Sequence, residues 1–254
     1  MTEPIFESAR LKIKRAEHHI GELESEFAAY VATKPHRFSV QNNAETGQTV
    51  IRIRFVSDPP KTLSLIIGDA IHNLRTALDH LTWEVVGIDG GTQDRHLAFR
   101  AGDSRVNFEA SCKGIVTPSD WVKDLHISLE VFPGGRGTEL YALHLLDNLD
   151  KHNVITPVLR ATTHPDFVIL NPDGKAGMVY SGNQFIGGDA DHFQIARVPP
   201  GCSVELQDDA KCTPEIFFRD IKWPAEPVIQ TIQRFIQKTL ITVAAFEAAV
   251  TKNT

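Results

Sequence analysis

Apolar side chains recur every three or four residues at both ends of the chain, as in long amphipathic helices. The first stripe covers about residues 4–33 and stops before Pro35, and the last covers about residues 224–251. Because the two stripes share their spacing, we expect the two helices to share one core. The stripe positions are Phe6, Ala9, Ile13, Ala16, Ile20, Leu23, Phe27 and Tyr30 at the start, and Ile229, Ile232, Ile236, Thr239, Val243, Phe246 and Val250 at the end.

Two more helices are predicted in the middle of the chain. Asp58-Pro59-Pro60 is a helix-start signal, and a helical pattern follows it over about residues 60–87. A third helix is expected over about residues 138–153. The stretch 88–137 between them contains several glycines, and we expect it to be irregular apart from short elements near residues 121–129.

Alternating patterns predict strands in two other stretches. Residues 38–56 predict a β-hairpin, and about residues 154–220 predict an antiparallel sheet inserted before the last helix. Within the insertion, residues 193–198 and 204–206 flank Pro199-Pro200-Gly201, which predicts a second hairpin. The other expected strands are residues 167–170 and 178–180, joined by the turn Asn171-Pro172-Asp173-Gly174, and residues 215–219.

Together these patterns predict a single α+β domain over residues 1–254. It would be a helical bundle of about four long helices with an N-terminal β-hairpin and an inserted antiparallel β-sheet. A hydrophobic content of 42% is enough to build a substantial core in a chain of this length.

Charge and cysteine content narrow the classes of function. The net charge of −6 gives no overall field that would gather nucleic acid, and no run of five or six Lys and Arg residues occurs, although a local basic patch remains open. The three cysteines, Cys112, Cys202 and Cys212, lack CxxC spacing, which predicts reduced thiols rather than a zinc ribbon. The charged N-terminus predicts no signal peptide, and no stretch is apolar enough to span a membrane. We therefore expect a cytoplasmic protein.

The predicted helix over residues 60–87 has an unusual polar face. On a helical wheel, Asp69, His72, Arg75, Thr76 and Asp79 gather opposite an apolar side, with neighbours three or four residues apart. A solvated helix face is normally built from Glu, Lys and Gln, yet none of these occurs between residues 68 and 83. Packing, hydrogen bonding or function should therefore compensate for the low helix propensity. The apolar side consists of Ile67, Leu74, Leu78 and Leu81.

The helix over residues 138–153 repeats this design. Leu143, Leu146 and Leu149 form its predicted apolar side. The opposite side carries His144, Asp147, Asn148 and Lys151, with Asp150 and His152 at its margins. Asp147 and Lys151 are four residues apart and can form an ion pair.

Three interpretations of these faces remain open, and the first is that both are ordinary solvated helix faces. The faces could line a cleft in which imidazole groups transfer protons while Arg75 and Lys151 hold an anion, a set of groups that suits phosphodiester or phosphate-ester chemistry without a metal. Alternatively, they could form a buried polar network in which Arg75 bridges carboxylates and stabilises a non-catalytic binding or scaffold protein. The catalytic candidates are His72, Arg75, Asp79, His80, His144 and Asp147, and the binding candidates are Asp69, Asn73, Asn148, Asp150, Lys151 and His152.

Two motifs carry a family resemblance. Residues 68–81, with the pattern GDAxHNLRxALDHL, and residues 143–152, with the pattern LHxLDNxDKH, resemble the signature stretches of a widespread family of uncharacterised bacterial proteins. The similarity covers most of the chain, with both motifs in the same order. The resemblance implies membership of that family and brings no established activity, substrate or cofactor.

Arg75-Thr76-Ala77-Leu78-Asp79-His80 also resembles the motif of HEPN ribonucleases, in which an Arg is followed by His after four to six residues. This resemblance implies a helical bundle that cleaves RNA at a homodimer interface, with Arg75 and His80 carrying the reaction. Thr76 departs from the residues frequent after that Arg. On an ideal helix Arg75 and His80 also point about 140° apart, so His72 and Asp79 are better placed beside Arg75.

A third resemblance is to bundles of the DinB group, which hold a divalent ion with histidines from different helices. It implies that His72, His144, Asp79 and Asp147 supply metal ligands, although no HExxH or paired Glu-x-x-His occurs. Gly134-Gly135-Arg136-Gly137, directly before a helix, could present N–H groups to an anion, with a flexible loop as the alternative. The expected partners are a second copy of the chain and an RNA or phosphate-containing ligand. No cofactor is assigned.

Overall fold

The computed structural model describes residues 5–163, 167–180, 192–206, 213–218 and 226–253. The chain divides into two compact units. The first, here the helical unit, comprises residues 1–25, 61–156 and 228–254, and the second, the β unit, comprises residues 26–60 and 157–227. The prediction of a single domain stays a prediction.

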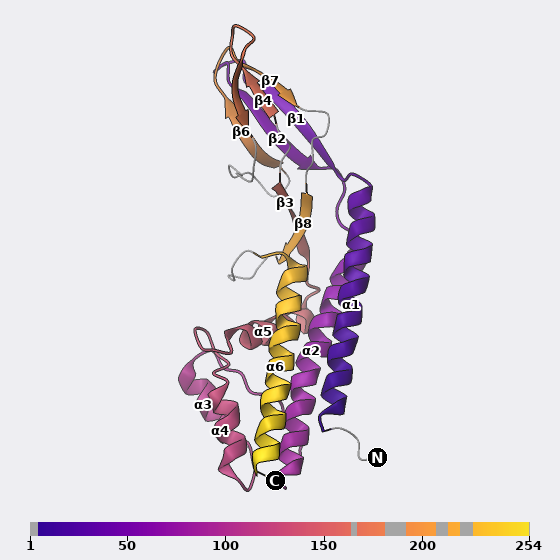
Figure 1. The fold of residues 1–254 in the computed structure, drawn as a ribbon, viewed down its shortest axis with the longest axis vertical. Coiled ribbons are helices and arrows are strands. Elements are labelled where there is room, and N and C mark those ends of the chain that lie inside the picture. The colour runs from indigo at the N-terminus through magenta and orange to yellow at the C-terminus, as the bar shows by residue number, and fades with distance from the viewer. Residues whose placement is uncertain (1–4, 164–166, 181–191, 207–212, 219–225, 254) are drawn as a thin grey trace. The chain divides into compact units, whose positions relative to one another are not determined.

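Six helices are described (Figure 1). Within the helical unit α2 packs against both α5 and α6, α5 packs against α6, and α3 packs against α4. The first part of α1, up to Ser25, belongs to the same unit. The helices are α1 (Glu7–Ala32), α2 (Lys61–Ile88), α3 (Arg105–Lys113), α4 (Asp120–Ser128), α5 (Thr138–His152) and α6 (Val228–Asn253).

Most positions of the predicted stripes lie in the core of the helical unit, while Phe27 and Tyr30 belong to the β unit. Phe6, Ile13 and Leu23 of the first stripe are buried, as are Phe246 and Val243 of the last. Phe6 meets Phe246 edge to face, with 6.4 Å between ring centroids. The residues of the stripes therefore pack against each other within one chain. A homodimer formed through them stays an untested prediction.

The N-terminus of α1 is held by a carboxylate of α2. Glu84 accepts a hydrogen bond from the backbone N–H of Phe6 at 2.9 Å and another from the Ser8 hydroxyl. The first of these bonds satisfies a backbone N–H that the start of a helix leaves without an intrahelical partner, and the second adds a side-chain contact. One α2 side chain thus fixes where α1 begins.

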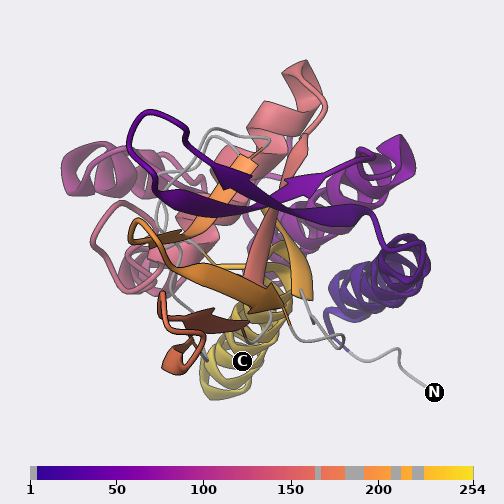
Figure 2. The ribbon, with the colours of Figure 1, turned by 90° about the horizontal axis from the view of Figure 1, so that it is seen from above.

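Three small antiparallel sheets make up the described part of the β unit. The strand orders are β1-β2-β6, β3-β8 and β5-β4-β7. In Figure 2 the β1–β2 hairpin is drawn in indigo and violet, with its turn at the left. The strands are β1 (His36–Asn42), β2 (Thr49–Phe55), β3 (Pro157–Thr163), β4 (Phe167–Leu170), β5 (Ala176–Tyr180), β6 (His192–Val198), β7 (Ser203–Leu206) and β8 (Thr213–Phe218).

The inward faces of these strands share one core. Ile51 and Ile53 of β2 lie in one buried cluster with Phe167 of β4 and Ile195 of β6. Side chains on a strand alternate between faces, so the residues between Ile51 and Ile53, and on either side of them, point away from that cluster. This alternation leaves an outer face on the β1-β2-β6 sheet.

The α+β class is confirmed, and the first hairpin pairs as predicted, from His36 with Phe55 to Asn42 with Thr49. The β4–β5 hairpin is also present. The predicted β6–β7 hairpin is wrong, because β6 pairs with β2 while β7 pairs with β4. The Pro199-Pro200-Gly201 turn instead carries the chain from one sheet to another, since the open edge of β2 needs a partner for its backbone groups.

The helical unit contains α3, which was not predicted, in addition to α4 near the expected residues 121–129. The arrangement is therefore not clearly the regular four-helix bundle expected from the stripes. Three predicted element ends lie outside the described residues: the start of the first helix at residue 4, the end of the β insertion at residues 219–220, and the start of the last helix at residue 224. No helix in the described part of the chain is long and apolar enough to cross a membrane. Cys112 and Cys202 are free thiols, and Cys212 lies outside the described residues.

One imidazole is fully buried in the helical core. His126 of α4 lies 2.8 Å from the Val122 carbonyl through Nδ1 and 3.2 Å from the Thr82 hydroxyl through Nε2. Its ring meets Phe246 edge to face. Burial lowers the pKa of His126 from 6.5 to about 4.

The stability of the protein should therefore fall in mild acid. Below pH 6.5 the unfolded chain takes up a proton at His126 that the folded chain takes up only near pH 4, so acid favours unfolding across this window. The shift corresponds to roughly 3 kcal/mol. Urea denaturation at pH 7, 5.5 and 4.5 measures it. The loss between pH 7 and 4.5 should shrink in His126→Gln, and an equal loss in both proteins would contradict the assignment.

Candidate functional site

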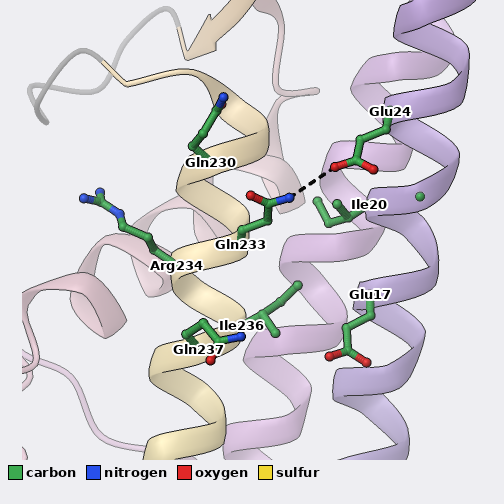
Figure 3. A pocket seen from close by; sticks show the side chains of 9 residues that line it. Glu17, Ile20, Glu24, Gln230, Gln233, Arg234, Ile236 and Gln237 are labelled. Atoms are coloured by element: carbon green, nitrogen blue, oxygen red, sulfur yellow. Dashed lines mark hydrogen bonds between the residues drawn. The ribbon is translucent and has the colours of Figure 1, made fainter.

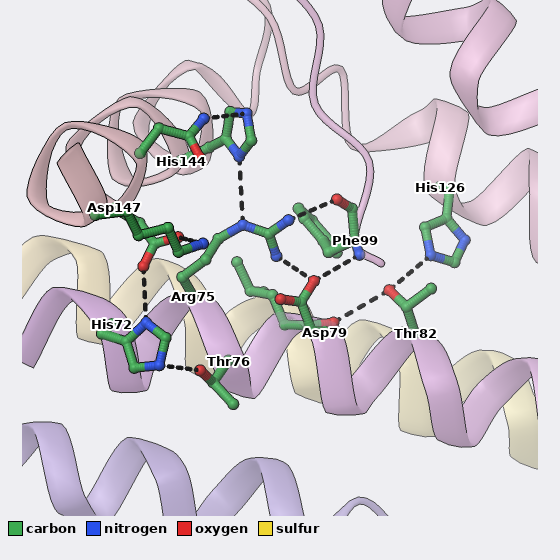
Figure 4. A network of polar contacts seen from close by, with 12 residues as sticks. His72, Arg75, Thr76, Asp79, Thr82, Phe99, His126, His144 and Asp147 are labelled. Carbon is green, nitrogen blue, oxygen red and sulfur yellow. Dashed lines mark hydrogen bonds and ion pairs between the residues drawn. The ribbon is translucent and has the colours of Figure 1, made fainter. Parts of the chain in front are cut away.

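Arg75 lies at the centre of a polar network between α2, α5 and the segment around Phe99 (Figure 4). Its Nη1 pairs with Asp79 Oδ1, its Nη2 donates to the Phe99 carbonyl at 2.9 Å, and its Nε faces His144 Nδ1 at 3.4 Å. The guanidinium carbon lies 5.8 Å from the centre of the Phe99 ring. Arg75 is only 6% exposed. Both of its terminal nitrogens and Nε therefore already have acceptors.

Asp79 completes a clamp on the Phe99 backbone. The same oxygen that pairs with Arg75 accepts the Phe99 N–H at 2.8 Å. Arg75 and Asp79 thus bind both the carbonyl and the N–H of one residue. Since Phe99 lies in an otherwise irregular segment, this clamp fixes that segment on α2. We refer to Arg75, Asp79 and the Phe99 backbone as the Arg75 clamp.

A second group of contacts joins His72 to α5. His72 Nδ1 lies 3.0 Å from Asp147 Oδ1, and His72 Nε2 lies 3.4 Å from the Thr76 hydroxyl. The His72 side chain is 55% exposed, while that of Asp147 is 1% exposed. Lys151 Nζ forms an ion pair with Asp147 Oδ2 at 2.6 Å, in an orientation that makes no hydrogen bond. A buried carboxylate therefore orients a solvent-exposed imidazole.

His144 is an uncharged partner of Arg75. Burial is the main reason that its pKa lies below the ordinary value, and the positive charge of Arg75 lowers it further. Because Arg75 Nε can only donate, His144 Nδ1 must accept, and a neutral ring then carries its proton on Nε2. Asn148 Nδ2 lies 3.0 Å from that nitrogen, and since both would donate, the Asn148 amide must turn its oxygen toward the ring. His144 thus serves as a hydrogen-bond acceptor near neutral pH.

His80 lies apart from this network. Its Nδ1 is 3.1 Å from the Ser8 hydroxyl, which in turn donates to Glu84. His80 therefore faces the beginning of α1, whereas Arg75 faces α5 and Phe99. The Arg75–His80 pair implied by the HEPN resemblance is not brought together, as the angle between the two positions on a helix leads one to expect.

The remaining predicted binding residues surround the network or lie outside it. Asp150 approaches α2 so closely that a Cβ on Gly68 would lie 2.5 Å from its carboxylate, and burial raises the pKa of Asp150. Asn73 donates to the Asp69 carbonyl at 2.8 Å and lies 3.4 Å from Lys12 Nζ. Asp69 and His152 are exposed.

The helical wheel placed some of these residues incorrectly. It set Arg75 and Asp147 on polar faces opposite the core, yet both are buried, because the two faces meet each other instead of lining an open cleft. Leu149, expected on the apolar side of α5, is 36% exposed. The role of the Phe99 backbone could not be predicted from the sequence, since no side-chain pattern marks a main-chain partner.

Two other expected chemistries find little support in the geometry. Within residues 5–163, 167–180, 192–206, 213–218 and 226–253, no group of three or more His, Cys, Asp or Glu side chains could hold a metal ion. The predicted ligand set from α2 and α5 is thus not assembled. In the glycine-rich loop before α5, Glu130 accepts hydrogen bonds from the Arg136 N–H and Nε, both at 3.2 Å. The carboxylate of Glu130 thus takes the place of the external anion that this loop could have bound.

A cleft lies between α1 and α6, away from the network (Figure 3). It has a volume of about 660 Å³. Gln233 Nε2 on α6 donates a hydrogen bond to Glu24 Oε1 on α1 at 3.1 Å, across the cleft. None of the predicted site residues lines it. The lining residues are Glu17, Ile20, Gly21, Glu24, Gln230, Gln233, Arg234, Ile236 and Gln237.

No protein-family model, no curated protein and no solved structure matches this chain.

Arg75→Ala should lower the free energy of unfolding by about 2–4 kcal/mol, because it removes a buried charge and leaves Asp79 and the Phe99 carbonyl without their partner. Asp79→Asn keeps an oxygen that can accept the Phe99 N–H and should cost less. Urea denaturation measures both changes.

Arg136→Ala is a suitable control, because the Arg136 side chain is 72% exposed and also pairs with a carboxylate. It should change stability by about 1 kcal/mol or less. If Arg75→Ala is no more destabilising than Arg136→Ala, the clamp does not hold the helical unit together.

Proposed function

We propose that this protein is a non-catalytic binding or scaffold protein in which the polar faces of α2 and α5 support the fold. The observation that carries the proposal is the Arg75 clamp. Arg75 is 6% exposed and spends its donors on Asp79, Phe99 and His144. An arginine that stabilises charge in a reaction must present donors to the substrate, and in this one each of the three nitrogens already donates to a group of the protein.

The arrangement of the histidines supports the same proposal. His144 accepts a hydrogen bond from Arg75, and His80 binds Ser8 beside the start of α1. Neither imidazole stands beside a free cationic group, which metal-independent RNA cleavage by an Arg–His pair would require. Under this proposal, family membership, a cytoplasmic location and homodimer formation are further expectations, and the function of the network depends on none of them.

A second candidate function is phosphodiester or phosphate-ester hydrolysis at His72. The specific observation is that a buried carboxylate, Asp147, binds Nδ1 of an imidazole that is itself 55% exposed. A carboxylate in this position orients the ring, as in known acid–base catalysts. Lys151, half exposed beside the same carboxylate, could hold an anionic substrate.

An RNA-cleavage assay with chelator present separates the two functions. The purified protein, His72→Ala and His80→Ala should all show the same background cleavage of a labelled single-stranded RNA. His152→Ala is the matched control, because His152 is an exposed histidine on α5. Cleavage that disappears in His72→Ala and persists in His152→Ala would replace the non-catalytic proposal with the hydrolase. Cleavage that is lost only in His80→Ala would instead favour the HEPN-type reaction with Arg75 and His80.

A further inference from the structure

The outer face of the β1-β2-β6 sheet gathers arginines from distant parts of the sequence. Arg37 lies on β1, Arg52 and Arg54 lie on β2, and Arg197 lies on β6. Arg37 is paired with Arg54 across the strands, and Arg197 is paired with Val50. Since Val50, Arg52 and Arg54 are two residues apart, all four arginines share one face. We call them the arginine row.

The row runs diagonally across the three strands. It begins at Arg197, passes Arg52 and ends at the Arg54–Arg37 pair. With strands about 4.8 Å apart and about 3.4 Å per residue along each strand, the row is roughly 17 Å long. This places the guanidinium groups along one narrow line instead of over a broad surface. Such a line matches a single phosphate backbone better than the two backbones of a duplex.

Nothing in the described residues neutralises the row. The three strands contain no Asp, Glu or Lys. In the described part of the chain none of the four guanidinium groups forms an ion pair. Arg37, Arg54 and Arg197 are exposed, and Arg52 is half-buried with its Nη1 on Gln41. The groups therefore remain able to bind an external anion.

The arrangement of the four arginines disfavours the folded state, so a contribution to stability does not account for it. Like charges directly opposite each other in an antiparallel pair, as at Arg37 and Arg54, are destabilising. The chain carries a net charge of −6, so overall composition does not explain a cluster of only positive charges on one face of the sheet. All four cations are arginines, whose planar fork binds phosphate oxygens in pairs.

We propose that the arginine row is a binding surface for single-stranded RNA, which it contacts through the phosphate backbone. Stacking on large aromatic rings contributes little, because the positions of the three described strands that share this face include no Phe, Tyr or Trp, although His192 is paired with Arg54. The binding is therefore governed by charge and should show little sequence preference. The proposal uses residues of the β unit only, so it does not depend on whether the α2–α5 network is catalytic.

The full-length protein and a fluorescein-labelled oligouridylate of about 20 nucleotides test the proposal by anisotropy at several salt concentrations. The parent should bind with a micromolar Kd that weakens with salt, by up to about 0.7 log units per contacted phosphate for each tenfold increase in salt. Arg52→Gln/Arg54→Gln should weaken binding roughly tenfold and reduce the salt slope by about 1.4. Arg37→Gln/Arg197→Gln should behave similarly while leaving Arg52 and its bond to Gln41 intact.

The matched control is Lys14→Gln/Arg15→Gln, which removes the same charge from exposed positions on α1. It should change the Kd less than twofold, and circular dichroism should show that every variant remains folded. No binding by the parent, or equal weakening in the control, would overturn the proposal. Displacement of the RNA by polyglutamate as readily as by unlabelled RNA would overturn it in favour of an acidic protein partner.

Discussion

The buried guanidinium of Arg75 is the interaction on which the helical unit depends. A charge taken out of water is costly unless it is paired and hydrogen-bonded, and removing one partner of such a network leaves the others buried without it. Here α2 supplies Asp79, α5 supplies His144 and an irregular segment supplies the Phe99 carbonyl. Three parts of the chain must therefore be in place together before the charge is accommodated. The network makes the packing of these parts specific rather than merely favourable.

The same interaction explains what the sequence could and could not reveal. The absence of Lys, Glu and Gln from residues 68–83 predicted a special face on α2, and the pairing of Arg75 with Asp79 follows from their spacing. The wheel could not tell that this face is covered, because solvent exposure depends on what packs against a helix. The partner at Phe99 is a backbone group, which any residue type can provide. Asp147 was likewise placed on the polar side of its helix, and the spacing could not show that this residue is buried.

The long elements were predictable for a physical reason that the short ones lack. A stripe that repeats over several turns, as in α1 and α6, distinguishes a helix from every alternative. In α3 only Phe108 and Cys112 are buried, a spacing too short to establish a period, although Ser104 caps the helix by accepting from the Asn107 N–H. The arginine row was missed for a related reason. A search for runs of basic residues detects neighbours in sequence, whereas strand pairing placed Arg37, Arg54 and Arg197 together.

The close approach of Asp150 to Gly68 has a consequence for the register of the two helices. Three contacts step along them in opposite directions, from Gly68 with Asp150, through His72 with Asp147, to Arg75 with His144. The two motifs are thus complementary halves of one antiparallel seam. Sliding α5 by a single turn, about 5.4 Å, would bring a side chain against Asp150 in place of Gly68 and would separate both polar pairs. Over this stretch a substitution at a position outside the three contacts keeps the seam in register. The insertion or deletion of a residue in one helix would shift the seam unless the other helix changed as well.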